Sequence, residues 1–187
     1  MAKNLIIGGM SGSGKSTQVK LLAQKFKMKP IFTSKLFREL QKQDLQTNGF
    51  WEKQGGTKFL QQRLNNLSAD KAFDKKLLEI SAKGNFVMDS WTMPWLMDKD
   101  SMVAVWLEAS PETRAKRVAK RNKQTQEEVL KAIKEKEELS KRIYYQAYGI
   151  KFGEDLKPFS IVLNTDNLSE KKVFAILSAF VQAVLKK

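Results

Sequence analysis

The sequence contains no cysteine and no histidine. Without cysteine there is no disulfide and no thiolate metal site, and without histidine there is no imidazole catalysis and no histidine metal ligand. No apolar run approaches the roughly 18 residues that a membrane span needs. The N-terminus passes at once into a predicted strand, which leaves no room for a signal peptide. We therefore expect a protein of the reducing cytoplasm that has no membrane partner.

Acidic residues are scarce, with 20 against 34 basic ones, and the formal net charge is +14. Such a charge suggests polyanionic partners, either nucleotides or nucleic acid, or it reflects only a lysine-rich proteome. Six of the basic residues are arginines, and four of these lie between residues 114 and 142. Because the guanidinium group binds phosphate oxygens in a fixed fork geometry, this clustering predicts phosphate recognition in that segment.

The strongest motif lies near the N-terminus, where residues 9–16 fit G-x-x-x-x-G-K-[ST] at every fixed position. A short apolar run at residues 5–7 predicts a strand before it, and apolar residues at helical spacing predict a helix after it. Glycines let the loop amides converge on an anion at the helix N-terminus. Lys15 would then meet the β- and γ-phosphates of a nucleoside triphosphate. The predicted ATP-binding residues of this loop are Gly9, Met10, Ser11, Gly12, Ser13, Gly14, Lys15, Ser16 and Thr17.

Strands and helices alternate along the chain, which predicts an α/β fold with a doubly wound, five-stranded parallel sheet. At 187 residues, one domain is expected. The strands are expected at residues 5–7, 28–33, 85–89, 102–107 and 160–163. N-cap residues are expected at Ser34, Ser110, Thr125 with Glu128, and Ser169. Helices are expected up to about residue 26 and at 34–40, 57–67, 69–83, 111 onward, 125–147 and 169–185, with a polar turn or loop at 44–56.

Asp89 stands at the carboxyl end of the third predicted strand, where ligands bind in sheets of this kind. A carboxylate at that point can hold Mg²⁺, directly or through water, together with the Ser16 hydroxyl. The alternative is an aspartate that only caps a helix or stabilises a turn. Ser16 and Asp89 are thus the predicted metal-binding residues.

Arg114, Arg117 and Arg121 fall along one stripe of a predicted helix. This stripe is either a phosphate-binding face or an ordinary solvated basic face. The helix at 125–147 is charged on most of its surface, so it is expected to pack little and to move as a lid. The alternative is an ordinary exposed helix with pairs such as Glu137–Lys141.

The order of these motifs resembles that of nucleoside monophosphate kinases, and most closely the archaeal-type cytidylate kinases. The resemblance covers nearly the whole chain. It is carried by the phosphate loop, Leu36-Phe37-Arg38-Glu39, the acid ending the third strand, Trp106-Leu107-x-Ala109, Arg114-x-x-Arg117-x-x-x-Arg121 and Tyr148-Gly149. It implies one P-loop kinase-type domain over residues 1–187, with a helical acceptor-binding region at about 33–84 and a lid at about 114–148.

The resemblance also assigns roles by position. Arg38 would grip the phosphate of the acceptor, and Asn164-Thr165 would border the adenine of ATP. Arg117 and Arg121 would contact the transferred phosphoryl group. The catalytic candidates implied in this way are Lys15, Asp89, Arg117 and Arg121.

The chain departs from the family pattern in the half that would bind the acceptor. Ser34-Lys35 replace Gly-Asp, and Ser90-Trp91 replace Gly-Arg. Lys136 and Ile143 stand where the family has two arginines, with Arg142 one residue away. Trp91 would either stack on a base or pack with Met93 and Trp95 as a structural cluster. The acceptor-binding candidates are Arg38, Ser34, Trp91 and Arg142.

The activity implied by the resemblance is Mg²⁺-dependent transfer of the γ-phosphoryl group of ATP to a nucleoside monophosphate, with CMP expected and dCMP or UMP as alternatives. A P-loop kinase for a nucleoside or another small molecule is a second hypothesis. A P-loop ATPase or nucleotide-binding protein acting on RNA is a third. Because the chain carries no clear basic–aromatic recognition motif, we expect any nucleic-acid binding to be non-specific. A monomer is expected.

Lys15→Ala should remove most turnover and leave the fold intact, because the motif assigns Lys15 to phosphate charge and not to packing. Steady-state ADP release by the purified variant measures the effect, and circular dichroism checks the fold. Unchanged turnover would contradict every kinase interpretation of this chain.

Overall fold

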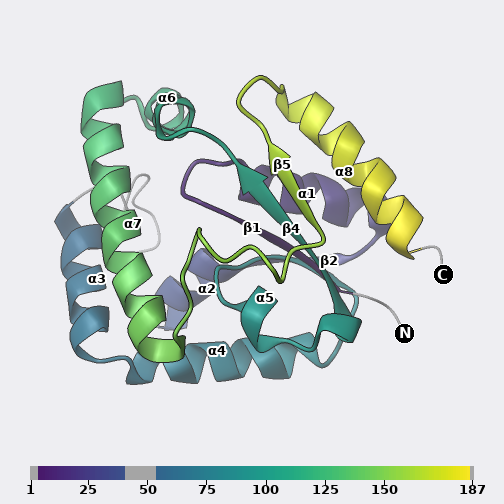
Figure 1. Cartoon of the computed structure of the whole chain (residues 1–187), viewed down its shortest axis with the longest axis horizontal. Coiled ribbons are helices and arrows are strands. Elements are labelled where there is room, and N and C mark those ends of the chain that lie inside the picture. Colours follow the sequence, from purple (N-terminus) through teal and green to yellow (C-terminus); the bar gives the residue numbers. More distant parts are fainter. Residues whose placement is uncertain (1–3, 41–53, 186–187) are drawn as a thin grey trace.

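The computed structural model describes residues 4–40 and 54–185, in which helices cover both faces of a five-stranded sheet (Figure 1). The strand order is β2-β3-β1-β4-β5, and every adjacent pair is parallel. The predicted doubly wound α/β sheet is therefore confirmed. The strands are β1 (Asn4–Gly9), β2 (Lys29–Phe32), β3 (Phe86–Asp89), β4 (Met102–Glu108) and β5 (Ile161–Asn164).

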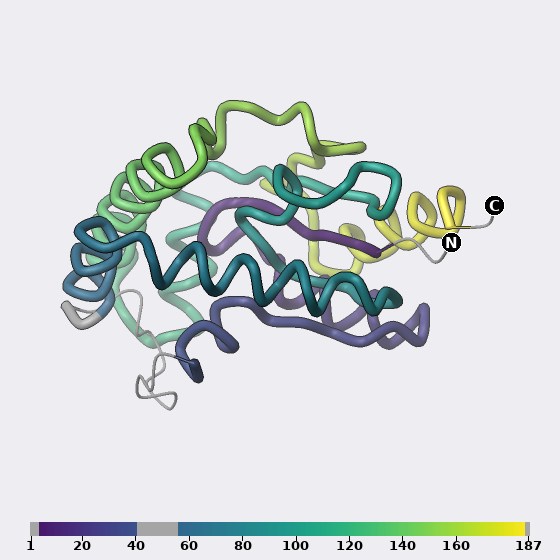
Figure 2. The backbone as a smooth tube through the Cα atoms, turned by 90° about the horizontal axis from the view of Figure 1, so that it is seen from below, coloured from purple at the N-terminus to yellow at the C-terminus, as the bar shows by residue number. Residues whose placement is uncertain are grey.

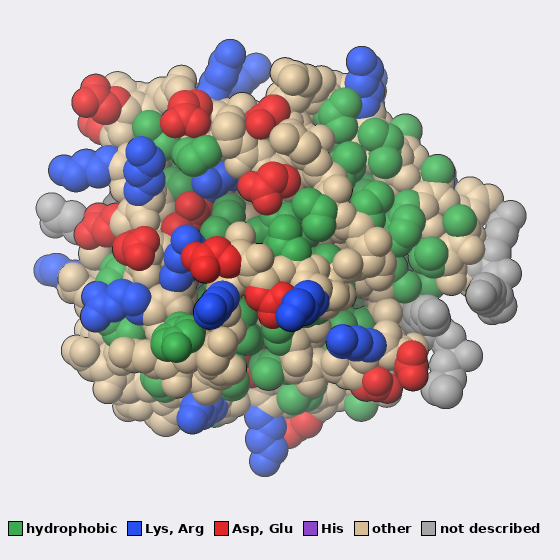
Figure 3. Space-filling view, in the orientation of Figure 1, with side chains coloured by type: hydrophobic (Ala, Val, Ile, Leu, Met, Phe, Trp, Pro, Cys, Tyr) green, Lys and Arg blue, Asp and Glu red, His purple; other side chains and the backbone are tan. Residues whose placement is uncertain are grey.

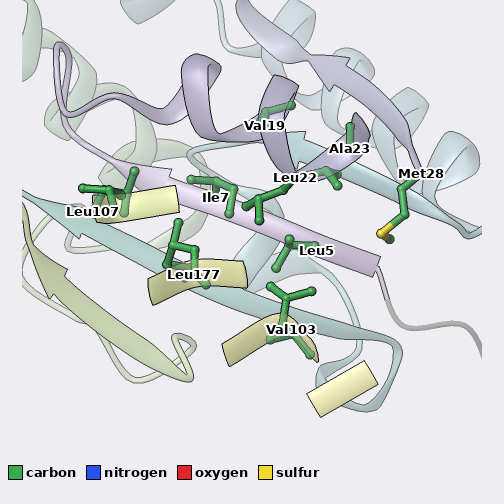
Figure 4. Close-up of a cluster of buried hydrophobic side chains, with 13 residues drawn as sticks. Leu5, Ile7, Val19, Leu22, Ala23, Met28, Val103, Leu107 and Leu177 are labelled. Carbon is green, nitrogen blue, oxygen red and sulfur yellow. The ribbon is translucent and has the colours of Figure 1, made fainter. Parts of the chain in front are cut away.

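Alternation along the central strands builds a separate core on each face of the sheet. Leu5 and Ile7 of β1 project from one face of the sheet, and this face is covered by α1 (Lys15–Phe26) and α8 (Glu170–Leu185). Figure 4 shows these two side chains between α1 and Leu177 of α8. Both faces of β1 are buried, as expected for a central parallel strand.

The other face of the sheet packs against helices that come before and after β3. Ile6 of β1 and Met88 of β3 contact Leu77 of α4 (Ser68–Ser81) and Met93 of α5 (Met93–Leu96). The short α2 (Thr33–Leu40) follows β2, and the 3₁₀ turn η2 (Lys99–Ser101) leads into β4. The carboxyl ends of β1, β2 and β3 therefore open toward α2 and the phosphate loop.

A third layer lies beyond the carboxyl end of β4. Here α7 (Gln126–Tyr148) packs between α3 (Gln54–Asn65) and α6 (Pro111–Asn122). Figures 1 and 2 both show α3 and α7 side by side at the same end of the molecule. Ile143 and Tyr144 of α7 join a cluster with Trp106 and Phe152, while Val129 and Ile133 pack on α6. None of the described helices is both long enough and apolar enough to cross a membrane.

Most predicted boundaries agree with the structure to within two residues. The Ser110 hydroxyl caps α6 by accepting from the Thr113 amide, and Thr125 with Glu128 forms the predicted capping box. Ser34 does not cap α2, because that helix already begins at Thr33. The loop predicted at 44–56 lies mostly outside the described residues, and residues 54–56 belong to α3 instead. The sequence pattern also gave no indication of α5.

The packing of α8 generates a stability prediction. Leu177 is fully buried against the sheet, whereas its neighbour Ile176 is 38% exposed. Leu177→Ala should lower the free energy of unfolding by about 2–5 kcal/mol. Ile176→Ala should lower the free energy of unfolding by less than about 1 kcal/mol, since this side chain already faces solvent in part and its removal leaves no closed cavity. Urea unfolding followed by circular dichroism measures both, and equal losses would contradict the orientation of α8.

Candidate active site

The phosphate loop joins β1 to α1 and holds backbone conformations that favour glycine. Gly12 has φ of +80°, and a Cβ there would meet the Arg114 carbonyl oxygen at 2.8 Å. Gly14 has φ of +98° and takes the left-handed conformation at the N-cap of α1. Residues from Gly12 to Thr17, which include the N-terminus of α1, line one cavity, and this is a suitable arrangement for binding phosphate.

Lys15 is bonded to the loop that carries it. Its Nζ donates to the carbonyl oxygens of Gly9, at 2.6 Å, and Met10, at 2.8 Å. Burial lowers the pKa of Lys15 to about 7; Asp89 partly opposes this shift and the charge of Lys136 adds to it. A negatively charged ligand in the loop would reverse this shift by favouring the ammonium form.

Asp89 links the loop to α2. Its Oδ2 accepts from the Ser16 hydroxyl at 2.9 Å, and its Oδ1 accepts from the Thr33 amide at 2.7 Å. Asp89 therefore caps the start of α2, as the alternative interpretation expects, and it also contacts Ser16 of the loop. A hydroxyl beside a buried carboxylate offers the oxygen ligands that Mg²⁺ prefers when it also binds phosphate oxygens. The donor set of Ser16 and Asp89 thus fits a magnesium ion.

Two cavities meet at Lys15. The larger cavity, of about 540 Å³, is lined by loop residues Gly12 to Thr17 and by Arg117, Arg121 and Thr165, among others. Arg117 donates to Thr165 through both ends of its fork, to Oγ1 at 3.0 Å and to the carbonyl oxygen at 2.6 Å. This contact places Arg117 at the end of the larger cavity that adjoins Thr165.

The smaller cavity, of about 70 Å³, lies on the other side of Lys15. Thr33, Ser34 and Asp89 line it, together with side chains from α3, α4 and α7. Among the described residues, Lys15 is the one that lines both cavities. The site can therefore hold two ligands on either side of a single cationic side chain.

A family model, described as the cytidylate kinase-like family, matches residues 5–167. The chain belongs to this family. A cytidylate kinase from Sulfurisphaera tokodaii is 33% identical over 98% of this chain and 97% of its own length. One from Methanocaldococcus jannaschii is 27% identical over 97% of this chain and 99% of its own. The protein is accordingly a phosphotransferase.

Solved structures agree on the fold. A shikimate kinase from Bacteroides thetaiotaomicron has a TM-score of 0.62 at 16% identity, with each chain covered in full. A shikimate kinase from Acinetobacter baumannii has a TM-score of 0.60 at 14% identity, covering 100% of this chain and 97% of its own. The P-loop kinase-type fold is thereby confirmed.

Arg114 of this cytidylate kinase-like protein is buried, contrary to the prediction of a phosphate-binding or solvated basic face. It is 3% exposed and donates to the Ser11 carbonyl oxygen at 3.0 Å and to the Ala109 carbonyl oxygen at 3.0 Å. It also forms an ion pair with Glu137 of α7. The predicted Glu137–Lys141 pair is wrong, since Lys141 pairs with Glu154. The expectation that α7 packs little is also wrong. Glu137 of α7 pairs with Arg114 of α6, and Arg114 in turn donates to the loop.

Trp91 packs in a cluster that includes Trp95, as one of its two interpretations predicts, whereas Met93, the other expected partner, belongs to a different cluster. Its indole Nε1 donates to the Gly9 carbonyl oxygen at 2.9 Å, and its ring packs on Phe152 with centroids 4.6 Å apart. The Nζ atoms of Lys15 and Lys136 lie 5.6 and 5.3 Å from the ring centre. Trp91 therefore belongs to a packed cluster and also forms a wall of the smaller cavity.

Other predicted residues lie outside the two cavities. Arg142 is exposed on α7 and lines neither of them, and the same holds for Asn164 at the end of β5. Arg38 is half-buried on α2 and lines neither, although Ser34 on that helix lines the smaller one. The part of the loop formed by Gly9, Met10 and Ser11 lines neither cavity. Its carbonyl oxygens accept hydrogen bonds from Lys15 and Arg114, and it supports the site in this way.

Sequence reasoning missed most of the smaller cavity. Arg63, Asp70, Asp74, Ser140 and Tyr144 line it, and none was predicted. Arg63 carried a usable signal, since it is one of only six arginines in a lysine-rich chain. The other four carried none, because Asp, Ser and Tyr are common on exposed helices.

The lowered pKa of Lys15 predicts proton uptake when ATP binds. At about pH 8, a group with a pKa of about 7 is mostly neutral in the free protein, and phosphate charge raises its pKa on binding. Binding should therefore take up close to one proton. Isothermal titration calorimetry in buffers of different ionisation enthalpy measures this number. Lys15→Arg is the control, because its guanidinium stays charged and uptake should vanish. Equal uptake by both proteins would contradict the assignment to Lys15.

Proposed function

We propose that the protein transfers the γ-phosphoryl group of ATP to the phosphate of a nucleoside monophosphate, with CMP as the expected acceptor and dCMP or UMP as alternatives. The observation that carries the proposal is the position of Lys15 between two cavities that share no other described residue. A phosphoryl group that is transferred from a phosphate in one cavity to a phosphate in the other must pass Lys15. The cytidylate kinases similar to this chain support the choice of CMP.

ATP would occupy the larger cavity. Its phosphates would lie in the loop from Gly12 to Thr17, and its base would lie toward Thr165, which Arg117 holds in place. Mg²⁺ would be held by Ser16 and Asp89, where it would supply charge neutralisation between the β- and γ-phosphates. Arg121 lines the same cavity and is placed to meet phosphate charge from the side of α6.

The monophosphate would enter the smaller cavity with its phosphate toward Lys15. Its attacking oxygen is already anionic, so the transfer needs no general base. The chain contributes positioning and charge neutralisation instead. Lys15 would release the Gly9 and Met10 carbonyl oxygens to follow the transferred group, and Lys136 of α7 would add a second ammonium group beside it.

The smaller cavity is far below the roughly 300 Å³ that a small-molecule site usually offers. Acceptor binding would therefore move the walls of this cavity apart, chiefly α3 and α7. Because Arg114 and Glu137 connect α7 to the loop, this movement would also shift the loop that holds the phosphates of ATP. Both cavities are lined by residues of a single chain.

The net charge of +14 does not by itself favour nucleic acid as the substrate. On the face drawn in Figure 3, lysine and arginine side chains are interspersed with acidic ones and do not gather in a single patch. Interspersed charges on this face support weak, salt-sensitive association there at most.

A coupled ADP-release assay with a panel of acceptors tests the proposal. CMP should give a kcat/KM at least about a hundredfold above that of cytidine, because only the monophosphate gains charge-assisted hydrogen bonds from its phosphate. Cytidine serves as the matched control for CMP, and RNA as the control for an ATPase. ADP release that responds to nucleosides or RNA, and not to any monophosphate, would contradict the proposal.

A further inference from the structure

The two carbonyl oxygens that hold Lys15 each have a second donor. The Gly9 carbonyl oxygen accepts from Lys15 Nζ at 2.6 Å and from the Trp91 indole Nε1 at 2.9 Å. The Met10 carbonyl oxygen accepts from Lys15 Nζ at 2.8 Å and from the Ser13 amide at 3.3 Å. Because a carbonyl oxygen has two lone pairs, each of them can serve both donors at once. Lys15 can therefore leave both oxygens without leaving either of them unpaired.

The direction of the Gly9 carbonyl explains why a side chain is the second donor there. Carbonyl groups point alternately to the two sides of a strand, and the Ile7 carbonyl oxygen accepts from the Ser90 amide just after β3. The Gly9 carbonyl, two residues on, points to the same side. The Thr92 amide, which would be the next donor along that side, bonds to the Ser90 hydroxyl instead. The indole N–H of Trp91 thus takes the place of a backbone donor, which a buried carbonyl group requires.

Trp91 is held so firmly that its N–H stays in place when Lys15 moves. Its ring packs on Phe152 with centroids 4.6 Å apart, and it meets Tyr144 of α7 in an edge-to-face arrangement at 6.0 Å. Both of these neighbours are buried. Lys15, in contrast, ends a flexible four-carbon stem, and its Nζ lies 5.6 Å from the centre of the indole ring. The indole is therefore the fixed donor and the ammonium group is the movable one.

The movement of Lys15 toward a phosphate would be costly without this arrangement. Gly9 is buried, and a buried carbonyl oxygen that loses its last partner keeps the cost of desolvation without the hydrogen bond that offsets it. The bond from Trp91 removes this cost at Gly9, and the bond from the Ser13 amide removes it at Met10. Of these two donors, the indole is the one that a change of side chain can remove.

We propose that Trp91 is a positioning residue for Lys15, and that its indole N–H keeps the Gly9 carbonyl oxygen paired while the ammonium group moves from the loop to the phosphates of ATP. The inference rests on the proposed function, because it takes the loop to bind a triphosphate. It gives Trp91, which lines the smaller cavity, an effect on the ligand of the larger cavity. Trp91 acts through Lys15 in this way and needs no contact with ATP.

Trp91→Phe removes the N–H and keeps an aromatic ring beside the ammonium groups of Lys15 and Lys136. The dissociation constant of ATP with Mg²⁺ should rise by about tenfold, because the Gly9 carbonyl oxygen loses its remaining partner in the bound state. Isothermal titration calorimetry without any acceptor measures this constant. An unchanged dissociation constant in Trp91→Phe would overturn the inference.

Trp95→Phe is the matched control. Trp95 belongs to the same cluster as Trp91, but its Nε1 has no hydrogen-bond partner among the described residues and it lines neither cavity. Trp95→Phe should therefore bind ATP as the wild-type protein does. Equal losses of ATP affinity in the two variants would mean that the cluster has only a structural role, and they would contradict the inference.

A double-mutant cycle shows whether Trp91 acts through Lys15. Lys15→Met keeps most of the length of the side chain and removes the ammonium group, so no group moves from the loop. In that background Trp91→Phe should change the dissociation constant of ATP by less than about twofold, against about tenfold when Lys15 is present. A general defect in packing would instead weaken ATP binding equally in both backgrounds, and that result would refute the proposed role.

Benzothienylalanine at position 91 tests the N–H by itself. This amino acid has sulfur in place of the indole N–H and keeps both fused rings, so the packing on Phe152 is preserved. It should weaken ATP binding about as much as Trp91→Phe does, and the same amino acid at position 95 should leave ATP binding unchanged. Wild-type affinity with benzothienylalanine at position 91 would overturn the inference, even if Trp91→Phe fails to fold.

These titrations need no turnover, so the inference and the proposed function can fail separately. If ATP binding depends on the Trp91 N–H but the protein phosphorylates no monophosphate, the proposed function fails and the role of Trp91 stands. If the protein phosphorylates CMP and the loss of the N–H leaves ATP binding unchanged, the proposed function stands and the role of Trp91 is wrong.

Discussion

The buried guanidinium of Arg114 holds together the parts of the molecule on which phosphate binding depends. It donates to the carbonyl oxygen of Ser11 in the loop and to that of Ala109 after β4, and it pairs with Glu137 of α7. Removing one partner from a buried pair of this kind typically costs about 3–5 kcal/mol, because the other charge is left unpaired. The shape of the loop and the position of α7 are therefore not independent. A change in the position of α7 must therefore also shift the backbone of the phosphate loop.

The sequence predicted the parts of the site that are local along the chain. The phosphate loop, the central strands and the caps at Ser110 and Thr125 each depend on residues within a few positions of one another, so a single sequence displays them. The burial of Arg114 depends on Glu137, which lies 23 residues away in the sequence. The burial of Arg63 depends on the packing of α3 with α4 and α7. A charged residue looks the same in sequence whether its partner is water or a buried carboxylate. For this reason α7 was predicted to be exposed, although its charged face completes the core of the site.

Two of the departures that the resemblance implies, Trp91 and Lys136, lie side by side in the structure. Lys15, Lys136 and Arg114 already bring three positive charges close together, since both Lys136 and Arg114 lower the pKa of Lys15. An arginine at position 91 would add a fourth. Trp91 instead gives the Gly9 carbonyl oxygen a neutral donor and gives the two ammonium groups an aromatic ring. The tryptophan therefore stabilises a cationic site without increasing its charge.

The burial of Lys15 against its own loop has a chemical consequence. An ordinary lysine is protonated at neutral pH and a poor nucleophile, because its pKa is about 10.4. Lys15, with a pKa of about 7, is neutral in about half of the molecules at neutral pH, and it lies beside two cavities. Amines of that kind form imines with aldehydes and react with activated esters far faster than exposed lysines do. Among the 28 lysines of this chain, Lys15 is thus one whose reactivity toward such reagents would rise as the pH passes about 7, and phosphate charge that restores its ammonium form would lower that reactivity.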